Sequence, residues 1–157
     1  NNELNKIISF FLDKNILSEK LEELLNTKTN DDFNKLKDEA FMGNKSNTNK
    51  LLANTTMDYE KNILYLNIIN QRLEKLLQIH QLNKSNIEDS INSLKPPIFW
   101  KDKPNITSQV KKWDKYKIRN MFEVTFDLEK KIKTNNLIEK NILIKKLLLD
   151  ICSKANS

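Results

Sequence analysis

The sequence predicts an all-α protein, and its composition and periodicity are the two observations behind that prediction. The 157 residues include a single glycine, Gly43, and only three prolines. Tight turns between strands usually need residues that tolerate a positive φ angle, so a multi-stranded sheet is hard to build from this composition. Leucine and isoleucine recur instead at intervals of three and four residues, which is the period of an amphipathic helix. A chain of this length is also long enough to bury a sizeable core.

The first third of the chain predicts a group of short helices. Apolar residues at helical spacing indicate helices over residues 2–13 and 18–25. A third helix begins near Asp31 and ends at Gly43, because glycine can adopt the left-handed conformation of a helix C-cap. A short fourth helix follows. We therefore expect residues 1–54 to form a short-helix segment.

The remainder, residues 56–157, predicts a bundle of longer helices. A long helix starts at Thr56 or Asp58 and runs to about Leu82, and a shorter one follows it. The apolar stripe of the long helix comprises Tyr59, Ile63, Leu66, Ile69, Leu73, Leu76, Leu77 and His80. Two adjacent prolines end the shorter helix, since the first of them also forces its predecessor out of helical geometry. The apolar pattern then resumes, and two further helices are expected over residues 118–132 and 138–153. This part of the chain therefore reads as a helical-bundle domain.

Charge is distributed unevenly along the chain. Its net charge is +6, yet residues 1–94 hold 12 basic and 14 acidic side chains, whereas residues 95–157 hold 15 basic and 7 acidic ones. Such a basic half indicates that one end of the molecule faces an anion or an acidic partner. The alternative is a solvated, lysine-rich surface without a ligand. Both readings stay open on the sequence alone.

The compartment follows from the cysteine count and the absence of long apolar stretches. Cys152 is the only cysteine, so it has no intramolecular disulfide partner, which favours a reducing, cytoplasmic environment. No stretch approaches the roughly 20 apolar residues of a membrane span. The first residues show neither an initiator methionine nor a signal-peptide pattern, so we expect a piece of a longer cytoplasmic protein.

Catalytic groups are sparse in this sequence. The single histidine, His80, and the single cysteine cannot build a histidine–cysteine metal cluster, and both lie in apolar helical patterns that favour a packing role. No glycine-rich loop is present to hold a nucleotide phosphate. The carboxylates fall at expected helix starts or on solvent faces, where they compensate helix dipoles. We therefore expect a protein without enzymatic activity and without a cofactor or metal.

Residues 95–113 concentrate the prolines and both tryptophans. The prolines stiffen the connection between two helices. Phe99 and Trp100 are neighbours that point to opposite sides of an extended link, so we expect Phe99 in the core and Trp100 exposed. Trp113 is expected to share a helix face with Gln109 and Val110 and to be a second core anchor.

The lysines of the same region are candidate contacts. Lys101, Lys103, Lys111 and Lys112 could bind DNA phosphates or a neighbouring subunit, and Trp100 could cover a subunit seam or stack on a base. A solvated surface is the alternative for all four lysines. If the chain acts alone, this region favours a basic helical module that binds nucleic acid.

The spacing of this region resembles a family pattern. The pattern comprises two prolines, an aromatic residue, two lysines, a glutamine and a tryptophan, here Pro96, Pro97, Phe99, Lys101, Lys103, Gln109 and Trp113. It is similar to the C-terminal region of the delta subunit of bacterial DNA polymerase III, a clamp-loader subunit. Trp100 and Ile106 stand where phenylalanine is common in that family, and lysine replaces arginine at several positions, which weakens inferences about bidentate contacts.

The resemblance implies an assembly role in DNA replication. Residues 1–54 would be the end of a lid-like domain, and residues 56–157 would be the collar that joins the subunits of the loader. The partners would be the gamma/tau and delta prime subunits, with DNA as a further partner. The sliding clamp would be contacted only through an N-terminal domain that this sequence does not contain. A delta subunit does not itself hydrolyse ATP, so the resemblance also implies a non-catalytic chain.

Overall fold

The computed structural model describes residues 27–82, 86–134 and 139–157, and in these ranges it is helical, without a strand. The all-α prediction is thus confirmed. The helices are α3 (Thr27–Phe41), α4 (Lys45–Asn54), the 3₁₀ turn η1 (Tyr59–Lys61), α5 (Asn62–Leu82), α6 (Ile87–Asn92), α7 (Lys103–Val110), α8 (Lys115–Thr134) and α9 (Lys140–Lys154). The helices predicted over residues 2–13 and 18–25 lie outside the described residues.

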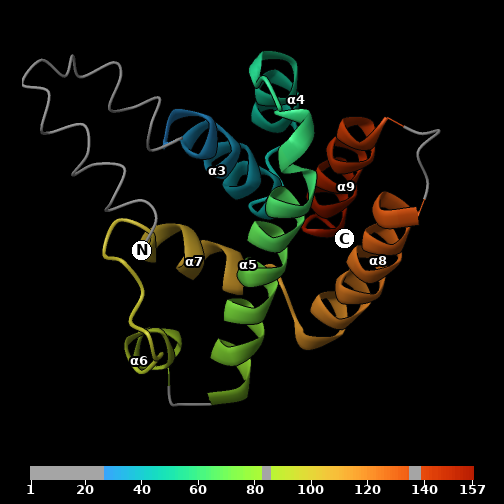
Figure 1. Ribbon diagram of the computed structural model, residues 1–157. Coiled ribbons are helices and arrows are strands. Elements are labelled where there is room, and N and C mark those ends of the chain that lie inside the picture. Colours follow the sequence, from blue (N-terminus) through green and yellow to red (C-terminus); the bar gives the residue numbers. More distant parts are fainter. Residues whose placement is uncertain (1–26, 83–85, 135–138) are drawn as a thin grey trace, which may run out of the picture.

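Helix α5 is the axis of the molecule (Figure 1). It packs against α6 and α7 near one end and against α8 and α9 on another side, while α3 packs on α4 and α9. Its buried side follows the expected stripe, which includes Leu66, Ile69, Leu73 and Leu76. The buried apolar side chains form one cluster that extends from α3 to α9. The proposed boundary near residue 55 therefore crosses a shared core, and the division into two domains stays a prediction.

Gly43 ends α3 as the sequence predicts. Its φ angle is +70°, and its N–H donates to the carbonyl of Ala40 at 2.9 Å. The N–H of Asn44 donates to the carbonyl of Glu39 at 3.0 Å. These two bonds form a Schellman motif, which satisfies carbonyl groups that the helix end leaves without partners. Asn44 then caps α4, since its side chain accepts from the N–H of Asn47 at 3.3 Å.

The start of the long helix differs from the prediction. Asp58 caps the 3₁₀ turn, accepting from the N–H of Glu60 at 3.0 Å, and α5 itself begins only at Asn62. Tyr59, which the pattern placed on the apolar stripe, is 54% exposed because it precedes the α-helix. Tyr65, six residues further along the chain, is the buried tyrosine, and the Tyr65 hydroxyl accepts from the N–H of Asp58 at 3.1 Å.

Candidate functional site

The link between α6 and α7 exposes two aromatic side chains. Ile98 is buried, whereas Phe99 and Trp100 are 62% and 67% exposed. The expectation that Phe99 enters the core is therefore wrong, and the expected exposure of Trp100 is confirmed. The reason is a turn, in which the N–H of Asp102 donates to the carbonyl of Phe99 at 2.9 Å. Successive side chains therefore no longer point to opposite sides, as they would in an extended link.

The exposed rings contact each other and a lysine. The centroids of Phe99 and Trp100 lie 5.8 Å apart with an interplanar angle of 49°, and Lys101 Nζ lies 5.3 Å from the Trp100 ring. The two prolines that precede this pair, Pro96 and Pro97, are themselves exposed. The link therefore presents an aromatic and basic surface to the solvent.

The four candidate lysines do not form one cluster. Lys101 and Lys103 lie at the start of α7, and Lys111 and Lys112 follow its end, about 12 Å away along an eight-residue helix. The ammonium of Lys103 donates to Asn92 Oδ1 at 2.8 Å, which ties α7 to α6. The other three side chains are exposed. A phosphate contact could thus involve one pair or the other, but not all four at one point.

Trp113 is the largest fully buried side chain. Its indole Nε1–H donates to the carbonyl of Phe41 at 2.9 Å, and the two rings pack with centroids 5.2 Å apart. His80 Nε2 is hydrogen-bonded to the backbone carbonyl of Trp113. Trp113 therefore joins the end of α3, the end of α5 and the link before α8, and His80 has the packing role that its pattern favoured.

Trp113 lies just beyond α7, and not within it as predicted. The helix ends at Val110, although the N–H of Trp113 still donates to the carbonyl of Gln109 at 3.1 Å, as in one more helical turn. All three side chains are buried, so the expected common face is present. The difference is one of helix boundary, where the last turn distorts.

Gln109 leads to a polar network that the sequence reasoning missed. Its side-chain Nε2 donates to Asp38 Oδ1 at 3.3 Å and to the Asp38 carbonyl at 3.5 Å. Asn105 donates to Asp38 Oδ2 at 3.2 Å. The motif glutamine, itself fully buried, thereby fixes α7 against α3. Buried polar groups need such partners, because each one left unpaired destabilises the fold.

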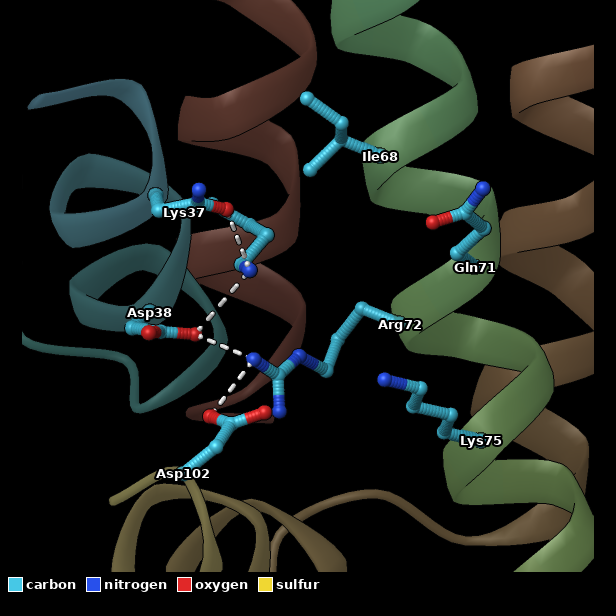
Figure 2. Close-up of a pocket in the computed structure, with 8 residues that line it drawn as sticks. Lys37, Asp38, Ile68, Gln71, Arg72, Lys75 and Asp102 are labelled. Carbon is cyan, nitrogen blue, oxygen red and sulfur yellow. Dashed lines mark hydrogen bonds and ion pairs between the residues drawn. The ribbon is translucent and has the colours of Figure 1, made fainter. Parts of the chain in front are cut away.

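Arg72 is the centre of this network (Figure 2). Its Nη2 donates to Asp38 Oδ1 at 3.0 Å and to Asp102 Oδ1 at 2.9 Å, so one nitrogen links α3, α5 and the start of α7. The arginine side chain is only 4% exposed. A sequence signal existed: position 72 follows Ile69 by three residues and precedes Leu76 by four, which places a cation on the apolar face of α5.

Lys37 adds a second buried cation. It is 5% exposed, and its ammonium contacts Asn34 Oδ1 at 3.0 Å and Asp38 Oδ1 at 3.5 Å. Burial, followed by the nearby charge of Arg72, lowers the pKa of Lys37 from 10.5 to about 8, against the opposite effect of Asp38 and Asp102. A charged Lys37 therefore lowers the free energy of unfolding of the protein.

Replacing Lys37 with methionine is therefore expected to raise the free energy of unfolding at pH 7, by about 1–3 kcal/mol. Because the folded pKa is about 8 and the unfolded value 10.5, the unfolded chain binds more protons between these pH values. The wild-type protein then gains stability as the pH rises, so the advantage of Lys37→Met shrinks through the same window. Urea unfolding across this window tests it, with exposed Lys35→Met as control; an advantage independent of pH would contradict the expectation.

A pocket of about 360 Å³ opens beside this network. Its walls come from α3 and α5, with Asp102 at one end, and Figure 2 shows Lys37, Arg72 and Lys75 extending toward the space between these walls. A second pocket, of about 250 Å³, lies between α8 and α9. The first pocket is polar and charged, and the second has leucines and a valine between charged side chains.

Comparisons with protein-family models, with curated proteins and with solved structures found no match for this chain. In the part of the chain that the structure describes, no three histidine, cysteine, aspartate or glutamate side chains are placed to hold a metal ion. Among the same residues, no helix is long and apolar enough to cross a membrane. The geometry of the site is therefore the basis for any functional conclusion.

Proposed function

We propose that this chain is the lid-end and collar part of a bacterial clamp-loader delta subunit, and that it acts by binding other loader subunits. The observation that carries the proposal is an apolar surface on the last two helices. Ile142 and Leu149 are 56% and 43% exposed, and their spacing of seven residues places them on one face of α9. Apolar side chains exposed on one helix face are the kind of group that a protein partner can cover.

The pocket between α8 and α9 is a second, partly apolar surface on these helices. It is lined by Val124, Leu128, Leu143 and Leu147, with charged side chains between them. Five of the ten exposed large apolar side chains in the described residues belong to these two helices. Both helices lie at one side of the molecule, away from α6 and α7 (Figure 1). An apolar centre with charged neighbours is the usual composition of a protein interface.

The proline–tryptophan segment supports the same proposal in a different way. Gln109 and Trp113, the last two residues of the family-like pattern, connect α7 and the following link to α3. Their positions require this packing, because an amide and an indole N–H must both find buried acceptors. The pattern thus holds α7 and the following link against α3, and the exposed apolar side chains of α8 and α9 form the surface proposed for the partner.

The test is binding to the clamp-loader ATPase subunits of a bacterium with an AT-rich genome, since the lysine- and asparagine-rich composition favours such a source. We expect a complex at micromolar concentration, and a loss of affinity of tenfold or more for the double variant Ile142→Asp, Leu149→Asp, which places charges on the apolar face. The control is Trp100→Asp, which changes an exposed apolar residue on the link between α6 and α7, away from α9. The absence of a complex with the unmodified chain would contradict the proposal.

The exposed Phe99–Trp100 pair favours one alternative, a stand-alone nucleic-acid-binding module. That alternative predicts salt-sensitive binding of single-stranded DNA without a protein partner, which Trp100→Asp would abolish. The same two variants therefore separate the hypotheses. Loss of the protein complex in the variant Ile142→Asp, Leu149→Asp supports assembly. Loss of single-stranded DNA binding in Trp100→Asp supports the nucleic-acid-binding module.

A further inference from the structure

The pocket between α3 and α5 contains more positive than negative charge. Three cationic side chains line it, Lys37, Arg72 and Lys75, against the two carboxylates Asp38 and Asp102. Lys37 and Arg72 are more than nine-tenths buried. The two carboxylates balance these two buried cations, so the exposed Lys75 gives the pocket one excess positive charge, which favours binding of an anion.

The carboxylates are already engaged. Asp38 Oδ1 accepts from Arg72, from Lys37 and from Gln109, and Asp102 Oδ1 accepts from the same nitrogen of Arg72. Among the described residues, the other terminal nitrogen of Arg72, Nη1, is buried and has no hydrogen-bond partner. A buried guanidinium donor without an acceptor is costly, so an anion bound beside Arg72 would stabilise it.

Lys75 supplies the third cation from the rim of the pocket. Within the described ranges its ammonium forms no ion pair. It extends from α5 toward Arg72, on the side of the pocket opposite Lys37 (Figure 2). Asn34 accepts from Lys37 through its amide oxygen, which leaves its amide N–H groups as further donors at the pocket. The pocket therefore presents donors from two walls.

We propose that this pocket binds a phosphate group, held between Lys37, Arg72 and Lys75. Arginine and lysine are the side chains that bind phosphate, the first through its planar donors and the second as a point charge. Although burial lowers the pKa of Lys37 to about 8, its ammonium is still mainly charged at pH 7. The phosphate group could belong to inorganic phosphate or to a nucleic-acid backbone. Both sources present the same oxygens to the pocket.

Titration of the full chain with inorganic phosphate at constant ionic strength tests the proposal. We expect saturable binding by calorimetry and a shift of the Arg72 side-chain signals in ¹H–¹⁵N spectra. These signals are readily assigned, because Arg119 is the only other arginine and Arg119→Lys removes its signals. Lys75→Gln is expected to weaken binding about tenfold or more, because it removes a charge-assisted hydrogen bond. Lys75 is exposed, so this variant should fold normally.

The control is Lys50→Gln, which removes an exposed lysine on α4, outside the pocket. Unsaturable binding, or equal affinities for Lys75→Gln and Lys50→Gln, would overturn the proposal. A second titration with a short single-stranded oligonucleotide identifies the source. If the oligonucleotide shifts the Arg72 signals and competes with phosphate, the ligand is a nucleic-acid backbone; if only inorganic phosphate does so, the ligand is the free anion.

Discussion

Replacing Trp113 with alanine is expected to lower the free energy of unfolding by about 4 kcal/mol. The side chain is fully buried, and it packs against Phe41 with ring centroids 5.2 Å apart. Its removal leaves a large cavity at the junction of α3, α5 and the link to α8. It also leaves the carbonyl of Phe41 without the indole donor, which adds the cost of an unpaired buried acceptor.

Urea unfolding followed by far-UV circular dichroism measures this effect, with Trp100→Ala as the matched control. Trp100 is 67% exposed, so its replacement should change stability by less than about 0.5 kcal/mol. Trp113→Phe is expected to cost less, about 1–3 kcal/mol, because it keeps a six-membered aromatic ring against Phe41 and removes the N–H donor together with part of the ring volume. Equal effects of the two alanine variants would contradict the assignment of Trp113 to the core.

Arg72→Met is expected to destabilise the fold by about 3 kcal/mol. The substitution keeps an apolar stem along α5 but removes the guanidinium, so Asp38 and Asp102 are left close together without the cation between them. Their side chains are 14% and 25% exposed, so water relieves part of the repulsion and places the value at the lower end of the range for a broken buried pair.

Arg119→Met is the natural control, since Arg119 is the other arginine of the chain and lies exposed on α8. We expect the control to stay within about 0.5 kcal/mol of the wild-type protein. Adding Asp38→Asn to Arg72→Met removes the like-charge contact and should recover part of the loss, a coupling that a double-mutant cycle measures. If the effect of the double variant equalled the sum of the effects of Asp38→Asn and Arg72→Met, the two residues would not be coupled. The ion pair between them would then not hold α3 against α5.

Much of the architecture followed from local rules. Gly43 ends α3 because only a residue that adopts a positive φ closes the Schellman motif, and that signal is visible in the sequence. The prolines and the apolar periods placed α5, α8 and α9 within a few residues of their observed bounds. Leu66, Ile69 and Leu73 are buried as their spacing indicated. These features depend on residues close to one another in the chain.

Features that depend on distant residues were not predictable in the same way. Phe99 is exposed because a turn at Asp102 reverses the link, and no periodicity reveals such a turn. The partners of Arg72 come from positions 34 residues before it and 30 after it. Gln109 is marked in the sequence only by the family-like spacing, and its partner Asp38 lies 71 residues before it, on α3.

The most direct test of the account is the mass of the complex that this chain forms with the clamp-loader ATPase subunits, measured by sedimentation equilibrium. The account predicts a stable mixed assembly containing one copy of this chain, and dissociation of that assembly when Ile142 and Leu149 are both replaced by aspartate. A chain that sediments alone beside the intact subunits, with its fold preserved by circular dichroism, would contradict the proposed function.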